Sequence, residues 1–407
     1  MTVTVRRIEW TDIEVARINL PGGVMRLTRS LASGLTRAPG DGEGVFWGVG
    51  DRGPNIGPAD GLERYGLESL RDLTGIDGAK VMPLLAVGPA LARLRLQGDR
   101  ITLEALHDLT DSTGTAIGGL PIPGAAHAES EPVFDLAGQP LTPGPGGADS
   151  EGIAALSDGT FWIAEEYGPS LLHVSRCGQV LERRVPRGME QSFAGARYPV
   201  RAVLPEIAAA RKLNRGFEGI AASDDGSVLF VALQSPLAHP DRAAHSGGDV
   251  VRIWEISTAD GALLGEHVYP LDPPESFRRD CAAGPVRKDD VKVAELQLDG
   301  AGGLLVMERV TQTTKVYRTD LSHQSRAPAA LSDPATRPTL EQLTRGEFAA
   351  AGVPLLEKTL LVSSDDHPEL CADLEGMVLL GAGKLLLAND SDYGVEGTAT
   401  QFFLVEW

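Results

Sequence analysis

The sequence repeats one pattern of apolar and polar positions along most of its length. Three segments align with one another without a gap: residues 149–169, 216–236 and 373–392. In each, Glu-Gly precedes a short apolar stretch, which is followed by a glycine-containing turn and a second apolar stretch. Short apolar runs around glycine turns are typical of paired strands, so the pattern predicts a β-hairpin that occurs several times.

Weaker copies of the hairpin lie between the three strong ones. Residues 44–54 match the second half of the first copy, with Asp51 at the position of Glu166. Residues 293–309 form a looser copy, in which a longer glycine turn leaves the register open by one residue. Residues 88–111 indicate a further, degraded copy. The copies therefore extend over nearly the whole chain.

The hairpins recur about 65 to 80 residues apart, with other strand-like stretches between them, as in four-stranded propeller blades with long loops. The sequence thus predicts an all-β protein: a single closed β-propeller of six four-stranded blades over residues 1–407. The final strand, Thr400 to Trp407, is expected to pair with strands near the N-terminus and so close the ring.

Composition narrows the classes of function. The chain has 37 Lys and Arg against 56 Asp and Glu, a net charge of −19, which opposes binding to nucleic acid and to anionic membranes. Its three cysteines stand far apart without a CxxC motif, which argues against both a disulfide framework and a zinc site. The N-terminus resembles no signal peptide, so we expect a cytoplasmic protein, or a periplasmic or secreted one if a leader has been removed. The oligomeric state stays open.

The hairpin register places acidic side chains opposite one another. A two-residue turn at positions 158–159 predicts that Glu151 lies opposite Glu166 in the first copy. The same count in the third copy places Glu375 opposite Asp390. Like charges in such pairs are destabilising, and a bound cation is the simplest way to offset them.

We therefore expect the acidic positions to converge at one end of the propeller channel. An all-oxygen set suits a hard cation, so the prediction is one or two Ca²⁺ ions or a similar divalent ion. The other interpretation is structural hydrogen bonding to amides at the strand ends. The predicted metal ligands are Asp51, Glu151, Glu218, Glu375 and Asp390.

Arginines stand within three residues of these acids along the chain. They indicate either salt bridges inside the acidic cluster or planar forks that bind a phosphoryl or carboxylate group. The predicted substrate-binding residues are Arg52, Asn55, Arg215 and Gln234, and the predicted catalytic residues are Glu166, Glu308 and Arg309. Ser150 lies in DSEG rather than in GxSxG, so no serine-nucleophile motif is recognisable.

The combination of motifs resembles a known family. DRGPN (Asp51 to Asn55), DSEGIAALSDGTFWIAEEYGP, the FEGIA copy, LLVMER and the closing LEGM and ANDSDYG are similar to the bacterial phytase-like domain, described as having the esterase-like activity of phytase. The resemblance covers about Leu27 to Leu404. It implies a β-propeller that acts on a phosphoric or related ester, with Ca²⁺ as in propeller phytases. One departure is that Ala232 and Leu233 stand where the first copy has two glutamates.

These observations together predict metal-assisted attack of water on a phosphoric ester at the channel mouth. An anionic small-molecule substrate can approach a ring of acids only if bound cations reverse the local field. The alternatives are a lactonase or carboxylester hydrolase with the same metal site, and a noncatalytic binding propeller with a structural Ca²⁺. A substrate screen with and without Ca²⁺ separates them.

Overall fold

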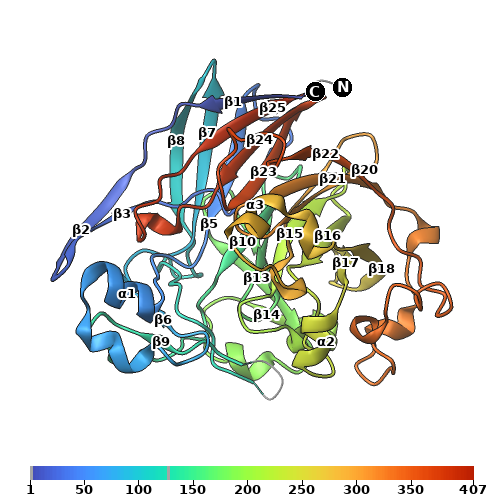
Figure 1. The fold of residues 1–407 in the computed structure, drawn as a ribbon, viewed down its shortest axis with the longest axis horizontal. Coiled ribbons are helices and arrows are strands. Elements are labelled where there is room, and N and C mark those ends of the chain that lie inside the picture. The colour runs from blue at the N-terminus through green and yellow to red at the C-terminus, as the bar shows by residue number, and fades with distance from the viewer. Residues whose placement is uncertain (1–2, 126–128) are drawn as a thin grey trace.

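Five β-sheets dominate the computed structural model, which describes residues 3–125 and 129–407 (Figure 1). Each is a blade of a β-propeller arrangement, so the predicted all-β propeller is confirmed, whereas the predicted number of six blades is wrong. Four blades have four strands and the second blade has five, because β14 adds to it in parallel. Closure of the ring stays a prediction, although the innermost strand β4 contacts both β10 and β23.

The strands of the blades run outward from the centre in chain order, except that the last blade ends on the first strand of the chain. The first blade comprises β4 (Gly34–Thr36), β5 (Val45–Gly50), β7 (Ala90–Gln97) and β8 (Arg100–Asp108), and the second comprises β10 (Ser150–Ala155), β11 (Phe161–Glu165), β12 (Ser170–Val174), β13 (Val180–Pro186) and β14 (Val200–Leu204). The third comprises β15 (Phe217–Ala222), β16 (Val228–Leu233), β17 (Val250–Ser257) and β18 (Leu263–Pro270), and the fourth comprises β19 (Lys292–Leu298), β20 (Gly303–Arg309), β21 (Thr314–Asp320) and β22 (Lys358–Ser363). The fifth comprises β23 (Leu374–Gly381), β24 (Lys384–Asn389), β25 (Phe402–Glu406) and β1 (Thr4–Ile8).

The remaining elements lie in loops between and beside the blades. They are the hairpin β2 (Glu14–Leu20) and β3 (Gly23–Thr28), which extends away from the blades in Figure 1; the parallel pair β6 (Lys80–Val81) and β9 (Val133–Phe134); and the helices α1 (Pro58–Tyr65), α2 (Arg242–Gly247) and α3 (Arg278–Ala283). Short 3-10 helices span Glu68–Leu73, Glu190–Phe193, Glu206–Ala210, Pro274–Ser276, Lys288–Asp290, His323–Ser325, Ala329–Ser332, Leu340–Gln342 and Asp392–Gly394. Within the described ranges, no helix is long and apolar enough to span a bilayer.

The blade count differs from the prediction because two predicted blades are parts of one. The partial copy at residues 44–54 supplies β5, and the degraded copy at residues 88–111 supplies β7 and β8 of the same sheet. β5 pairs directly with β7, from Val45 with Arg95 to Gly50 with Ala90. The 39 residues between these strands form an insertion that contains α1. The insertion separates strands of one sheet along the chain, so the two copies resemble two blades in the sequence, which explains the overcount.

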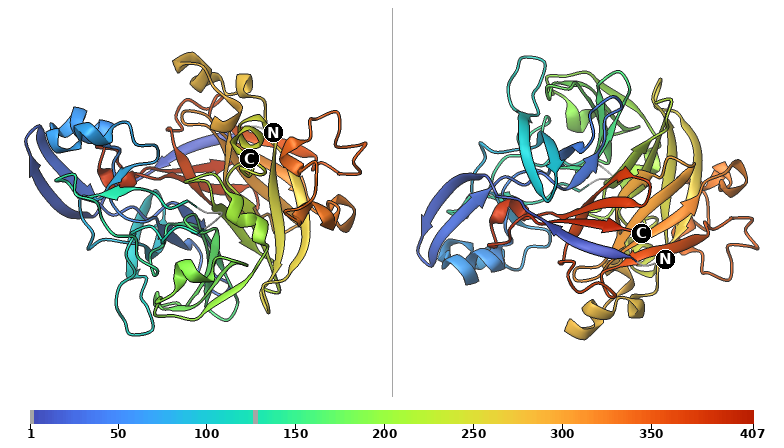
Figure 2. Two further views of the ribbon diagram at one scale, coloured as in Figure 1. Left: turned by 90° about the horizontal axis from the view of Figure 1, so that it is seen from below. Right: turned by 90° about the horizontal axis from the view of Figure 1, so that it is seen from above.

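The first and last strands of the chain complete one blade together. β1 pairs with β25 from Thr4 with Glu406 to Ile8 with Phe402, which confirms the predicted pairing of the C-terminal strand with the N-terminal region. The two ends of the chain lie side by side in both figures (Figures 1 and 2).

The Glu-Gly motif is explained by how closely the innermost strands approach. A Cβ atom on Gly152 of β10 would lie 2.3 Å from the carbonyl oxygen of Glu218 in β15, and one on Gly219 would lie 2.6 Å from the amide nitrogen of Leu296 in β19. Any side chain there would overlap the backbone of the next blade, so glycine is required. The fourth blade has Glu295 at this position, and its buried carboxylate accepts hydrogen bonds from the amides of Leu296 and Leu35.

Candidate active site

A polar pocket of about 220 Å³ lies at the end of the blades where the Glu-Gly motifs begin. All predicted site residues line it except Glu308. The lining residues are Asp51, Arg52, Asn55, Lys80, Glu151, Glu166, Asn214, Arg215, Glu218, Gln234, Lys292, Arg309, Asp373, Glu375, Asp390 and Asp392. The repeat therefore gathers chemically active side chains from all five blades.

Bulges on the innermost strands direct three glutamates toward this pocket. The pairing of β10 with β11 shifts by one residue between Ser150 and Ile153, so Glu151 lies in an irregular stretch. The same shift occurs in the third and fifth blades, where it includes Glu218 and Glu375. A β-bulge of this kind bends the strand and redirects side chains.

A second set of pocket residues stands at one equivalent position in every blade. Each is the last residue of the second strand or follows that strand directly, where the backbone leaves the sheet. The set is Asp51 after β5, Glu166 after β11, Gln234 after β16, Arg309 at the end of β20 and Asp390 after β24.

The predicted pairing of glutamates across the hairpins is wrong in register. Ser150 pairs with Glu165, and Leu374 with Asn389, so neither predicted pair is directly opposed. The turn is wider than two residues, since Ala155 pairs with Phe161, and the bulge then shifts the register again. The acidic side chains nevertheless converge, because they follow the paired positions.

The second hairpin has one residue more in its turn than the ungapped alignment assumes. Ala222 pairs with Leu229, whereas Ala155 pairs with Phe161. Gln234, and not Leu233, therefore corresponds to Glu166. Leu233 pairs with Phe217, so Glu218 does not face it as predicted.

The same one-residue shift moves Glu308 out of the pocket. Glu308 pairs with Val293 and is fully buried, where its carboxylate accepts hydrogen bonds from Tyr269, Lys358 and the amide of Asp272. It matches Glu165 of the second blade, which also points away from the pocket, toward Arg183. The next residue, Arg309, is the one that reaches the site.

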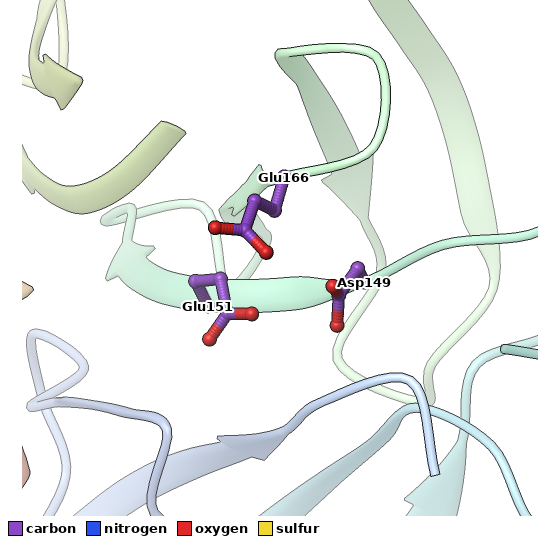
Figure 3. Close-up of side chains that lie close together, drawn as sticks. All are labelled: Asp149, Glu151 and Glu166. Carbon is purple, nitrogen blue, oxygen red and sulfur yellow. The ribbon is translucent and has the colours of Figure 1, made fainter. Parts of the chain in front are cut away.

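Asp149, Glu151 and Glu166 form the tightest group of acids in the pocket. One carboxylate oxygen from each lies within 4.8 Å of those of the other two (Figure 3). Burial raises the pKa values of Asp149 and Glu151 well above the usual range, and neighbouring carboxylates raise them further; Arg52 opposes the shift of Asp149. Neither Oε1 of Glu166 nor Oε2 of Glu218 has a hydrogen-bond partner within the described residues.

Asp51 and Asp390 extend the acidic group toward the fifth blade. Burial raises the pKa of Asp51 well above its usual range, and the charge of Asp390 adds to the shift. Both Asp390 oxygens accept hydrogen bonds from serine hydroxyls, those of Ser30 and Ser33, the latter at 2.5 Å.

Arg52 offsets part of this negative charge. Its buried guanidinium contacts Glu131, Asp149 and Glu166, and it also donates a hydrogen bond to Asn214. Its donors therefore lie mainly on carboxylates, which favours the salt-bridge interpretation for this arginine; a role in substrate binding stays a prediction.

The basic side of the pocket comprises Arg215, Lys292 and Arg309. Arg309 contacts Glu375 and donates to Asp373 at 2.8 Å, and Arg215 donates to Gln234 at 2.5 Å. The Nε atoms of both arginines are buried and have no acceptor among the described residues. Burial lowers the pKa of Lys292, and the charges of Arg309 and Arg215 lower it further. This side of the pocket thus carries positive charge and two donors that have no acceptor among the described residues.

Comparison with known proteins identifies the family of this chain. The family model described as phytase-like, esterase-like activity of phytase, matches residues 30–393. The chain belongs to the phytase-like family. An uncharacterized secreted protein of Arthroderma benhamiae is 33% identical over 235 residues, which are 51% of this chain and 43% of that protein. The aligned region thus spans less than half of that relative.

Solved structures similar to this phytase-like chain are distant. An aldose sugar dehydrogenase from Streptomyces coelicolor is 10% identical, with a TM-score of 0.32, over 100% of this chain and 98% of that one. A virginiamycin B lyase from Staphylococcus aureus is 12% identical, with a TM-score of 0.33, over the full length of both chains. At these scores the likeness carries no argument about the site.

Several residues of the phytase-like site lie outside the predicted set. Asp149 and Asp373 could have been identified from the sequence, because each stands two positions before the motif glutamate in a D-x-E-G sequence. No sequence pattern identifies Lys292, since its place beside Arg309 depends on the pairing of β19 with β20. The others are Lys80, Glu131, Asn214 and Asp392, which come from segments outside the strands of the blades.

A serine, a histidine and a glutamate elsewhere in the phytase-like chain are linked in a row. Ser325 Oγ lies 3.0 Å from His267 Nδ1, and His267 Nε2 lies 2.6 Å from Glu255 Oε1. The order resembles a catalytic triad. However, His267 is fully buried, and the Ser325 hydroxyl is 2.8 Å from the Ser322 carbonyl in a helix cap. We interpret the group as structural, and it serves below as a control.

The acidic group of the phytase-like chain fits a hard divalent cation. Its donors are all oxygens, and Oε1 of Glu166 has no hydrogen-bond partner among the described residues. The three side chains stand at two neighbouring strand ends of one blade, the start of β10 and the end of β11. Ca²⁺ takes six to eight such oxygens in flexible geometry. Asp149, Glu151 and Glu166 would hold the ion, with Asp51 and Glu218 nearest to complete the set.

Proposed function

We propose that this chain hydrolyses phosphoric esters in the acidic pocket, with Ca²⁺ or a similar hard cation as cofactor. One observation carries the proposal: among the described residues, side chains with unpartnered carboxylate oxygens and arginines with unpartnered Nε atoms line the same pocket. The acids suit a cation and the arginines suit an anion, which are the two requirements for binding a phosphoryl group. Membership of the phytase-like family supports a hydrolase.

Each side chain has a separate role in the proposed reaction. Arg215 and Arg309 bind the phosphoryl oxygens, and Gln234 keeps Arg215 in place through its amide oxygen. Glu166 orients the attacking water through its free Oε1 and accepts a proton from it. The water oxygen bonds to phosphorus, the phosphorus–oxygen bond of the ester breaks, the departing alkoxide takes a proton from solvent water, and Glu166 returns its proton to solvent. A bound cation would supply charge stabilisation for the phosphoryl group.

The test is turnover of 4-nitrophenyl phosphate by purified protein in Ca²⁺ and in chelator, with a lactone and 4-nitrophenyl acetate in parallel. We expect phosphoester turnover that requires the cation. Arg309→Ala should lose about 100-fold or more of it, the scale on which a transition-state donor contributes. Ser325→Ala, the control for a serine nucleophile, should keep full activity.

The same screen separates the alternatives. Turnover of the lactone or the acetate alone would replace the phosphoester proposal with a lactonase or carboxylester hydrolase. If none of the three is hydrolysed while Ca²⁺ still raises the melting temperature, a noncatalytic binding propeller with a structural ion takes its place.

The Arthroderma relative is named a secreted protein, and this supports activity outside the cytoplasm for the present chain too. The expected cytoplasmic location has no support among the comparisons. Fractionation of cells that express the full-length protein tests the proposal.

A further inference from the structure

A second hollow adjoins the acidic pocket. It has a volume of about 430 Å³ and shares Arg215 and Lys292 with that pocket. Its other walls are the segment 283–286 after α3 and the segment 310–312 after β20. The two shared cations therefore stand where the two hollows meet.

The walls of the second hollow are mixed: polar atoms make up most of the lining, with aliphatic groups among them. Ala283, Pro285, Val286 and Val310 contribute aliphatic groups. Asp280, the buried acid among the lining residues, accepts hydrogen bonds at 2.7 to 3.0 Å from the amides of residues 311–313. It thereby fixes one wall of the hollow and has little capacity left for a ligand.

The other acid at this hollow is engaged in the same way. Asp290 accepts hydrogen bonds from the backbone amide of Arg287 at 2.8 Å and from its guanidinium at 3.1 Å. Arg215 and Lys292, at the junction, are the only basic residues that line the second hollow in the described part of the chain. A second anionic group placed further inside would have no cation to bind, whereas a single anionic group can use the cations at the junction.

We propose that the second hollow binds the organic part of the ester, so that the substrate has one anionic phosphoryl group and a neutral, partly apolar alcohol group. This inference rests on the proposed function for the reacting end of the substrate. The phosphoryl group lies at Arg215 and Lys292, facing the acidic pocket, and the alcohol group lies against Ala283 to Val286. Burial of its apolar surface provides binding energy that small esters lack.

Gly284 allows the hollow to be filled without disturbing the fold. An added Cβ would meet no atom within 4 Å, and its φ of 171° is extended backbone that any residue adopts. Because Gly284 lines the hollow, Gly284→Trp should keep the fold and reduce the space in the hollow by the size of an indole. Gly346→Trp is the matched control, because an added Cβ there also meets nothing within 4 Å and Gly346 lines neither hollow.

The experiment measures binding of non-hydrolysable phosphonates by calorimetry in Ca²⁺. We expect the protein and Gly346→Trp to bind benzylphosphonate about tenfold more tightly than methylphosphonate, the effect of burying one aromatic ring in part. Gly284→Trp should abolish that preference and keep methylphosphonate binding. A carboxylate at the far end, as in 4-carboxybenzylphosphonate, should also remove the advantage.

Equal binding of the two phosphonates by the unaltered protein, or a preference that survives in Gly284→Trp, would overturn the inference, as would failure of both phosphonates to bind. The result is independent of turnover. If benzylphosphonate binds as expected and benzyl phosphate is not hydrolysed, the subsite stands and the proposed hydrolysis fails.

Discussion

Replacing Arg52 by methionine tests the charge balance of the pocket. The guanidinium is 4% exposed and contacts three buried carboxylates, those of Glu131, Asp149 and Glu166. Methionine keeps much of the side-chain volume but removes the charge. Without a cation, the variant therefore leaves three carboxylates in a buried site without their shared partner.

Breaking a buried ion pair from one side costs about 3 to 5 kcal/mol. An unfolding entropy of about 2.1 cal/mol/K per residue gives about 0.85 kcal/mol/K for 407 residues, so the melting temperature should fall by about 3.5 to 6 °C in chelator. In Ca²⁺ the fall should be smaller, because a cation bound to Asp149 and Glu166 replaces part of the lost positive charge. Arg52→Met should thus gain more from Ca²⁺ than the unaltered protein does.

Differential scanning fluorimetry in chelator and in a Ca²⁺ series measures both quantities. Arg183→Met is the control, since Arg183 is also fully buried and pairs with Glu165 but does not line the pocket. It should lower the melting temperature by a similar amount and gain nothing extra from Ca²⁺. An unchanged melting temperature for Arg52→Met in chelator, or an equal Ca²⁺ gain in both variants, would refute the reasoning.

Three further predictions concern the bound cation, stability in acid and the buried carboxyl of Glu295. Chelator should lower the melting temperature of the unaltered protein. Ca²⁺ at 100 times its dissociation constant should restore about 2.7 kcal/mol of folding stability, which raises the melting temperature by about 3 °C. No response in fluorimetry would contradict the cation site. Burial raises the pKa of Asp272, but hydrogen bonds from Lys315, Lys358 and Tyr317 outweigh it and lower the pKa to about 2. Its contribution to stability is present above the unfolded value near 3.9 and is lost as the pH falls toward 2, so Asp272→Asn should flatten that part of a pH–stability curve measured by urea unfolding. Burial raises the pKa of Glu295 well above the usual range, which disfavours the charged carboxylate, and its oxygens accept hydrogen bonds from the amides of Leu296 and Leu35. Glu295→Gln keeps an oxygen acceptor and should cost less than about 1 kcal/mol in urea unfolding, whereas Glu295→Ala should cost more than about 2; equal losses would contradict this.

The sequence predicted the class of fold and most of the pocket, because both depend on a repeat that is visible in the residues themselves. Asp51, Glu166 and Asp390 reach the pocket since each occupies the same position after a strand, whatever the exact cross-strand register. The register itself depends on bulges and on turn width, and Ala155 pairing with Phe161 shows a turn wider than the sequence suggested. Glu308 was misplaced by that same single residue.

The blade count and the basic side of the pocket could not be predicted for a different reason. The 39-residue insertion separates β5 from β7 along the chain, and nothing in the sequence marks these two strands as neighbours in one sheet. Lys292 approaches Arg309 and Arg215 only through strand pairing and packing of neighbouring blades. Contacts of this kind depend on three-dimensional structure rather than on the spacing of residue types.

The pairing of β1 with β25 has a consequence for how the chain folds during synthesis. Thr4 meets Glu406, so β1 must wait for a strand 402 positions later in the chain before its hydrogen bonds can form. Four blades can assemble from strands that are neighbours in sequence as the ribosome releases them, whereas the fifth requires a contact of the highest possible order. We therefore expect the final docking of β1 to be a late, slow event in folding. Ribosome-bound chains lacking residues 400–407 should leave β1 open to hydrogen exchange while the second and third blades are already protected.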